Sequence, residues 1–144
     1  MTTLAFIIPP NTELLDLAGP VQVFTEAKSY GFDADIRFYT YGDEPTSTSG
    51  LGFNKVGNYK DVHLKEGDYV FVPGMNWEYV NSISFRAERE FFKWLKQCSE
   101  NKMIVCSICN GAFALGEAGL LKNTPDFEKC YTNALVEDIH KRGF

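Results

Sequence analysis

The chain lacks several features that would assign it to a special class of protein. Its 144 residues contain no apolar run near eighteen residues, so no segment reads as a membrane-spanning helix, and no signal-peptide pattern is visible. The four cysteines lack the spacing of a disulfide framework, which favours a reduced protein of the cytoplasm. Without repeats or low-complexity tracts, the length fits one domain built around one hydrophobic core.

Basic residues and histidines are also scarce. The 14 Lys and Arg residues form no cluster and are outnumbered by 19 Asp and Glu, which argues against direct nucleic-acid binding by this segment. The two histidines, His63 and His140, lie at unrelated spacings, and no second C-x-x-C accompanies Cys106 and Cys109. This pattern disfavours a zinc site, and we expect neither a metal nor a cofactor.

Buried strands alternate with helices along the chain. Apolar or alternating runs predict strands over residues 4–8, 35–41 and 69–72 and a further strand beginning at 103. Helices are predicted over 20–30 and 85–100. The segment 42–57 is predicted to be a loop with a short hairpin. This order predicts an α/β fold, a doubly wound and mostly parallel sheet of the flavodoxin-like type with helices on both faces. Sites in such folds lie at the carboxyl ends of the strands.

One cysteine follows the last of these strands directly. Cys109 is succeeded by Asn110, Gly111 and a helix of small residues, which predicts a sharp strand-to-helix turn with a strained backbone at Cys109. In such a turn the N–H of Asn110 faces a developing oxyanion, and Gly111 lets the helix pack closely. The helix N-terminus is expected to lower the pKa of the Cys109 thiol and make it the most reactive of the four.

The same residues allow other interpretations. Cys106 and Cys109 have the C-x-x-C spacing of a thioredoxin-like redox pair, although Cys106 belongs to the apolar strand and suits a buried core position. Cys109 itself could be a core residue.

Two further segments follow predicted strands. Asp16, in LLDLAGP, is a carboxylate between apolar residues and is suited to proton transfer, or alternatively is a helix cap or a first-turn acid. The Pro73-Gly74-Met75 turn offers a backbone N–H as a second oxyanion donor, or is an ordinary turn that ends a strand.

Three stretches together, LLDLAGPVQVF, DYVFVPG and VCSICNGAFALGEAGLL, resemble the ThiJ/PfpI superfamily, which has a class I glutamine amidotransferase-like fold. The resemblance spans residues 4–123 and is nearest to isocyanide hydratases and to the N-terminal sensor domains of AraC-type transcriptional regulators. It implies that Cys109 is the reactive cysteine, that Asp16 is the acid beside it, and that Gly74 and Asn110 line an oxyanion pocket. It also implies a homodimer with the site near the subunit interface.

The chain departs from the family pattern at several positions. Asn110 stands where hydratases carry threonine, and Met75 replaces the second glycine of P-G-G and is expected to crowd the pocket mouth. The T-T-H-W segment with its histidine is absent, as though a piece between Asn123 and Thr124 were missing. We therefore expect residues 1–144 to form a single ThiJ/PfpI-like domain that lacks its last strand and helix.

These observations leave two functional classes open. The first is a small-molecule enzyme, a hydratase or hydrolase in which Cys109 and Asp16 act without a histidine, since His63 and His140 are expected to be solvated. The alternative is a catalytically weak domain that senses a small ligand for an AraC-type regulator. A domain without surviving activity is the third reading.

Overall fold

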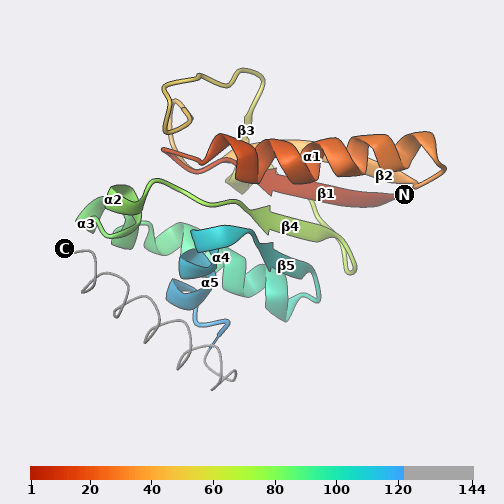
Figure 1. Ribbon diagram of the computed structural model, residues 1–144. Coiled ribbons are helices and arrows are strands. Elements are labelled where there is room, and N and C mark those ends of the chain that lie inside the picture. Colours follow the sequence, from red (N-terminus) through yellow and green to blue (C-terminus); the bar gives the residue numbers. More distant parts are fainter. Residues whose placement is uncertain (122–144) are drawn as a thin grey trace.

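The computed structural model describes residues 1–121 and contains a five-stranded parallel sheet (Figure 1). The strand order is β3-β2-β1-β4-β5. The strands are β1 (Thr2–Ile7), β2 (Ala34–Thr40), β3 (Gly57–Asn58), β4 (Tyr69–Val72) and β5 (Ile104–Ser107). The prediction of a doubly wound parallel sheet is confirmed. Two predictions concern parts of the chain outside the described residues: the missing piece after Asn123 and the loss of the last strand and helix. His140 also lies outside the described residues.

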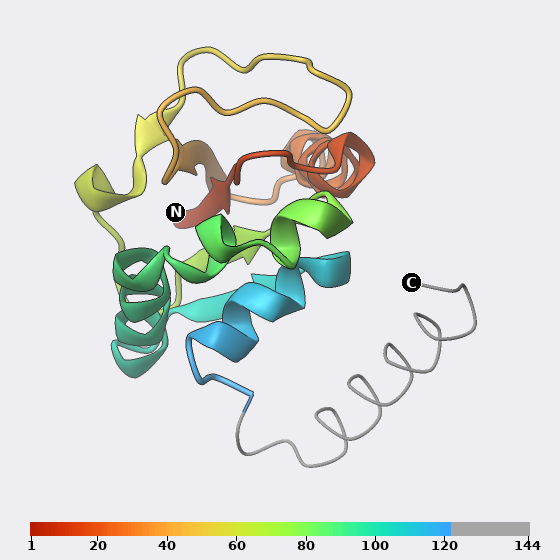
Figure 2. The same ribbon diagram turned by 90° about the vertical axis from the view of Figure 1, so that its left-hand side faces the viewer.

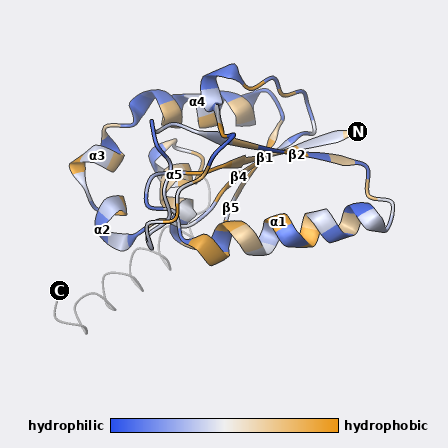
Figure 3. Ribbon diagram, turned by 90° about the horizontal axis from the view of Figure 1, so that it is seen from above, coloured by the Kyte–Doolittle hydropathy of each residue, from blue (hydrophilic) through white to orange (hydrophobic). Residues whose placement is uncertain are grey.

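Helices cover both faces of the sheet. The long helix α1 (Leu14–Ser29) lies on one face, and α4 (Arg89–Glu100) lies on the other together with α5 (Ala112–Glu117) (Figures 1 and 3). Two one-turn helices, α2 (Trp77–Val80) and α3 (Ile83–Arg86), follow β4, and the 3₁₀ turn η1 (Tyr59–Asp61) follows β3. Within residues 1–121, no helix is long and apolar enough to cross a membrane.

The central strand β1 supplies side chains to both halves of the core. Leu4 and Phe6, together with Ile8 directly after the strand, pack toward α1, whereas Ala5 and Ile7 pack with the residues of α4 and α5. This alternation follows from the two-residue period of a strand, and an almost continuous apolar run is what a strand buried on both faces requires. The sheet therefore holds the segments after β1 and its neighbours on a rigid base.

Helix α1 begins earlier than the sequence suggested. Gly19 and Pro20, expected at its start, lie inside the helix, although Pro20 cannot donate to the carbonyl oxygen of Asp16. Packing of Leu17 against the sheet and a 2.8 Å hydrogen bond from the N–H of Glu13 to the carbonyl oxygen of Gly74 hold the first turn in place. Asp16 consequently lies in the first helical turn.

The expected helix over 85–100 is also different, because it is divided into α3 and α4. Ser82 caps α3 by accepting the N–H of Phe85 through its hydroxyl, at 3.1 Å. The N–H of Arg89 bonds to the carbonyl oxygen of Ala87, which belongs to a turn and not to a continuous helix. The local cap at Ser82 therefore begins a separate short helix before the amphipathic one.

The segment between β2 and β3 is a loop that is fastened to the ends of β1 and β4. It contains one antiparallel bridge, Thr46 to Gly52, and no longer hairpin. Buried Thr12 bridges both to Ser47 in this loop and to Met75 after β4. Figure 2, in which the carboxyl ends of the strands face the viewer, shows this loop beside the start of α1. The loop thus forms part of the sheet edge at which a site is expected.

Candidate functional site

Three segments that follow neighbouring strands meet at the carboxyl edge of the sheet. Asp16 comes after β1, Gly74 after β4 and Cys109 after β5. Gly74 lies at the centre, because a methyl group placed on it would overlap Oδ2 of Asp16 and would lie 3.2 Å from Cβ of Cys109 and 3.2 Å from Oδ1 of Asn110. The chain turns from β2 on one side of β1 to β4 on the other, so this edge is the switch point of the fold.

Cys109 occupies a strained turn between strand and helix. It opens the 3₁₀ turn η2 (Cys109–Gly111), and its φ of 53° lies in the left-handed region that non-glycine residues rarely adopt. The N–H of Ile108 donates to the carbonyl oxygen of Val72 at 3.0 Å and fixes the turn to β4. The side chain of Cys109 is exposed. The predicted strain at this residue is confirmed.

Gly111 allows the helix after this turn to lie directly against β4. A methyl group on Gly111 would overlap the carbonyl oxygen of Val72 and would lie 2.8 Å from that of Pro73. These atoms belong to the backbone and cannot rotate away. The expectation that Gly111 permits close packing therefore agrees with the geometry.

The pKa of the Cys109 thiol is raised, and the prediction that it would be lowered is wrong. Desolvation of the thiol, which is only partly covered, is the largest cause, and the negative charges of Asp16 and Glu13 and a hydrogen bond with Asp16 act in the same direction. The backbone N–H of Asn110 opposes them by bonding to the sulfur. Helix α5 has only six residues, so the field at its N-terminus is outweighed by desolvation and by two nearby carboxylates.

Asp16 carries an unpaired oxygen beside the cysteine. Its Oδ2 is buried and has no hydrogen-bond partner among the described residues. Glu13, and not Asp16, occupies the N-cap position of α1. The helix-cap interpretation of Asp16 therefore fails, and the residue is a first-turn acid. A buried acceptor without a partner costs about 1–3 kcal/mol, and receiving a proton or a ligand is one role that would offset this cost.

Asn110 and Met75 are locked together through two hydrogen bonds. Oδ1 of Asn110 accepts the N–H of Met75 at 2.7 Å, and Nδ2 donates to the carbonyl oxygen of Met75 at 2.8 Å. The N–H of Met75 is thus engaged and cannot serve as the second oxyanion donor. The side chain of Met75 is 1% exposed and belongs to the core, so it does not crowd the pocket mouth as expected. Of the other two backbone N–H groups expected in that role, the one of Asn110 bonds to the sulfur of Cys109 in the free protein, and the other belongs to Gly74.

Sequence reasoning missed two residues of this region. Glu13 acts electrostatically on Cys109, and its Oε1 accepts a 3.0 Å hydrogen bond from the hydroxyl of Thr48. Thr48 comes from the loop after β2, where its N–H donates to the carbonyl oxygen of Thr12 at 2.9 Å. The spacing of three residues between Glu13 and Asp16 on one helix start was a usable signal, because such positions are neighbours. Nothing in the sequence marks Thr48.

The other candidate residues lie elsewhere. His63 is exposed and borders a surface pocket with Trp94, Gln97 and Cys98. Cys106 is half-buried in β5 and packs with the core residues on the α1 face, and both it and Cys109 are free thiols. Burial raises the pKa of Cys106, and it raises the pKa of Cys98 to about 12. Among residues 1–121, no three His, Cys, Asp or Glu side chains gather as a metal ion would require.

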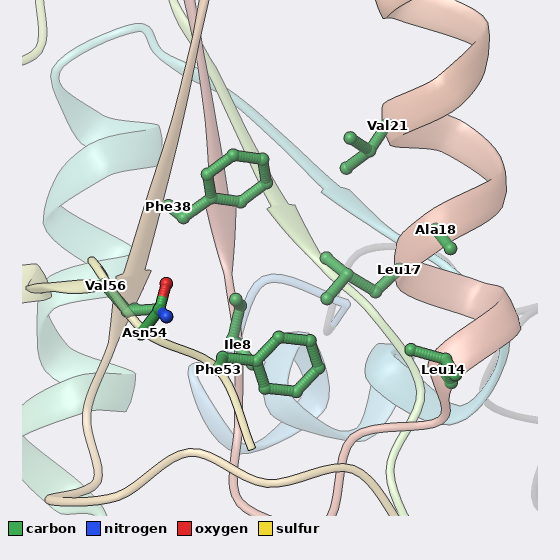
Figure 4. Close-up of a pocket in the computed structure, with 9 residues that line it drawn as sticks. All are labelled: Ile8, Leu14, Leu17, Ala18, Val21, Phe38, Phe53, Asn54 and Val56. Carbon is green, nitrogen blue, oxygen red and sulfur yellow. The ribbon is translucent and has the colours of Figure 1, made fainter. Parts of the chain in front are cut away.

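A separate apolar cavity of about 280 Å³ lies between α1 and β2 (Figure 4). Phe53 and Val56 of the loop after β2 border it, and Leu14 and Leu17 of α1 line the opposite side. Its remaining lining residues are Ile8, Ala18, Val21, Phe38 and Asn54. None of these side chains titrates or is nucleophilic, so the reactive groups of this sheet edge are those around Cys109.

Solved structures of low sequence identity share the fold. A ThiJ/PfpI family protein from Pseudomonas syringae superposes with a TM-score of 0.68 at 22% identity, covering 83% of this chain and 46% of that one. An AraC family transcriptional regulator from Pseudomonas putida gives a TM-score of 0.67 at 20% identity, covering 84% of this chain and 63% of that one. The chain thus spans about half to two thirds of the length of these structures.

Sequence comparison gives the family itself. An uncharacterized protein in the cpoL 5′ region of Streptomyces lividans is 30% identical over 113 residues, which are 76% of this chain and 74% of the relative. The model of the DJ-1/PfpI family matches residues 2–126. The switch-point site, the parallel sheet and this match agree, and the chain belongs to the DJ-1/PfpI family.

Proposed function

We propose that Cys109 and Asp16 form the reactive centre of a small-molecule site that adds water to a small electrophile, as in the isocyanide hydratases that the sequence resembles. One observation carries the proposal: a strained, exposed cysteine lies beside a carboxylate oxygen that is buried and unpaired. Strain of this kind, of about 1–3 kcal/mol, persists where the surrounding structure enforces it and is concentrated at functional sites.

Asp16 is the proton carrier in this scheme. The raised pKa means that Cys109 rests as a thiol at neutral pH, so the attack on an isocyanide carbon must remove its proton. Asp16 takes the thiol proton while the S–C bond forms, and it then delivers that proton to the same carbon. The product of this half-reaction is a thioimidate, in which the former isocyanide carbon carries one hydrogen and the sulfur of Cys109.

Water completes the reaction. Asp16 accepts a proton from a water molecule whose oxygen bonds to the thioimidate carbon, and it passes that proton to the nitrogen. In the resulting tetrahedral adduct the S–C bond breaks as the C=O bond forms, and the hydroxyl proton passes through Asp16 to the departing sulfur. Cys109 is thus a thiol again, and an N-substituted formamide leaves. The sum is one isocyanide and one water giving one formamide, with no oxidant or reductant. The N–H of Gly74, and the N–H of Asn110 once it leaves the sulfur of Cys109, are the donors proposed for negative charge that develops beside the reacting carbon.

A turnover assay with matched cysteine variants tests this proposal. The protein is incubated with an aryl isocyanide in ¹⁸O-water, and the formamide is detected by mass spectrometry. We expect labelled product from the wild type and from Cys106→Ser, and none from Cys109→Ser. Absence of product from the wild type, or equal product from Cys109→Ser, would contradict the proposed chemistry.

The second candidate is a ligand sensor, which is favoured by the structural likeness to an AraC family regulator over 84% of this chain. In that case the pocket binds a small molecule and Cys109 performs no turnover. A ligand that raises the melting temperature equally in the wild type and in Cys109→Ala, with no product formed, would support sensing. Loss of binding together with loss of turnover in Cys109→Ala would support the enzyme.

We also propose that the chain forms a homodimer in the cytoplasm. Leu14 and Leu15, which precede Asp16, are 39% and 81% exposed, and an apolar surface of this kind next to a site suits a subunit contact. Free thiols at Cys98, Cys106 and Cys109 are in keeping with a reducing compartment. Light scattering coupled to gel filtration tests the dimer, and a monomeric mass at micromolar concentration would contradict it.

A further inference from the structure

The described surroundings of Cys109 are negatively charged. Asp16 and Glu13 both act on the thiol through their charge, and within residues 1–121 no lysine, arginine or histidine is among the groups that shift its pKa. Oδ2 of Asp16 is buried, unpaired and next to Gly74 at the centre of the site. A small molecule that enters therefore meets two carboxylates without a compensating cation from residues 1–121.

Glu13 is attached to the segments around Cys109 through its backbone and its side chain. Its backbone N–H donates to the carbonyl oxygen of Gly74 at 2.8 Å, which ties it to the residue that separates Asp16 from Cys109. Its Oε1 lies 3.0 Å from the hydroxyl of Thr48, which shares its one proton between this oxygen and the carbonyl oxygens of Asn11 and Thr12. The N–H of Thr48 donates to the carbonyl oxygen of Thr12 at 2.9 Å and holds the loop in place. The residue is half-buried, so its charge reaches solvent at the edge of the site.

We propose that Glu13 is a specificity-determining residue that makes the Cys109 site select small cationic molecules, such as those with an ammonium group, over anionic ones. The inference rests on the proposed function, because it takes Cys109 as the atom that meets the ligand. It goes further by assigning the charge class of the substrate and the residue that sets it.

The division of labour between the two carboxylates follows from their contacts. Asp16 adjoins the thiol and exchanges its proton, so its charge changes during the reaction. Glu13 already has one oxygen engaged with Thr48 and keeps a carboxylate oxygen for a positively charged donor. Attraction of a cation and repulsion of an anion by the same charge act together on selectivity.

Three methanethiosulfonates of similar size provide the test: one with an aminoethyl cation, one neutral, and one with a sulfonatoethyl anion. In each case the thiolate of Cys109 displaces methanesulfinate and forms a mixed disulfide. The rate at which each reagent modifies Cys109 is measured by peptide mass spectrometry. It is divided by the rate at which the same reagent modifies free 2-mercaptoethanol, which corrects for differences in intrinsic reactivity. The ratio of the cation rate to the anion rate does not depend on the pKa of the thiol, because all three reagents consume the same thiolate.

We expect this ratio to be well above one in the wild type and to fall about tenfold in Glu13→Gln. One charge a few ångströms away in water changes a rate by roughly fivefold at most, and opposite effects on the two reagents multiply in their ratio. Glu26→Gln is the matched control, because Glu26 is an exposed residue of the same helix and does not act on Cys109. Its ratio should equal that of the wild type.

A ratio near one in the wild type, or the same ratio in Glu13→Gln and Glu26→Gln, would overturn the inference. Ionic strength gives a second reading that needs no variant. Raising the salt from 0.01 M to 1 M shortens the screening length from about 30 Å to about 3 Å. The cation-to-anion rate ratio of the wild type should therefore fall toward one. A ratio that does not change with salt would count against the inference. Failure of the proposed function is read separately, from the absence of labelled formamide in the turnover assay. A rate ratio near one with formamide formed overturns only the inference about Glu13.

Discussion

Substitution of Gly111 by alanine should loosen the turn that carries Cys109. The added methyl group would overlap the carbonyl oxygen of Val72 and lie 2.9 Å from its carbonyl carbon. Relief requires η2 and α5 to move away from β4, which breaks the 3.0 Å hydrogen bond from Ile108 to Val72. We estimate about 1 kcal/mol for that bond and about 1–3 kcal/mol for the overpacking. Since alanine suits a helical backbone better than glycine by about 1 kcal/mol, the net loss is about 1–3 kcal/mol.

Gly116 provides a control of opposite sign in the same short helix. A methyl group there meets nothing closer than Cδ1 of Leu121 at 3.9 Å, so Gly116→Ala should stabilise the protein by about 0.5–1 kcal/mol. Urea unfolding followed by circular dichroism measures the free energy of unfolding of both variants, and thermal unfolding measures their melting temperatures. At about 3 °C per kcal/mol, the melting temperature should fall by roughly 3–9 °C for Gly111→Ala and rise by roughly 1.5–3 °C for Gly116→Ala. Equal stabilities for the two variants would refute the proposed packing of α5 on β4.

Three further predictions concern the site and its support. Gly74→Ala should cost less stability than Gly111→Ala, because the methyl group mainly displaces the flexible carboxylate of Asp16, and it should alter the rate of Cys109 alkylation. Of the described cysteines, Cys109 should react first with iodoacetamide at pH 8 and Cys98 last, because Cys98 is buried and its pKa is raised to about 12. Peptide mass spectrometry that finds the reverse order would contradict this prediction. Asp68 is 2% exposed and accepts hydrogen bonds from the N–H groups of Thr3 at 2.8 Å and Lys65 at 2.9 Å. Asp68→Asn turns one of these acceptors into a donor and should lower the free energy of unfolding in urea by about 1–3 kcal/mol. The reactivity of Cys109 should stay unchanged.

The arrangement of the sheet and the strain at Cys109 could be predicted from the sequence because they depend on local patterns. Apolar runs identified β1 and β4, and a cysteine followed by Asn110 and Gly111 after a strand indicated the turn. The two-residue strand β3 escaped prediction because its pairing with β2 depends on tertiary structure alone. The start of α1 was misplaced because Pro20 is tolerated inside a helix whose first turn is anchored on Gly74.

The parts of the site that could not be predicted depend on contacts between distant segments. The engagement of Asn110 with the backbone of Met75 spans 35 positions and removes an expected oxyanion donor. The pKa of Cys109 was predicted in the wrong direction because a helix N-terminus is visible in a sequence, whereas desolvation and the charges of Asp16 and Glu13 appear only in the fold. Thr48 joins the site through the same long-range geometry.

The pH dependence of Cys109 alkylation in Asp16→Asn tests the central claim most directly. The charge of Asp16 and its hydrogen bond raise the pKa of the thiol, so removing the charge should move the midpoint of the rate profile to lower pH and increase the rate at neutral pH. Asp61→Asn, an exposed change of the same chemistry that does not act on Cys109, should leave the profile in place. An Asp16→Asn profile that coincides with the wild type, or that moves to higher pH, would contradict the pairing of Asp16 with Cys109.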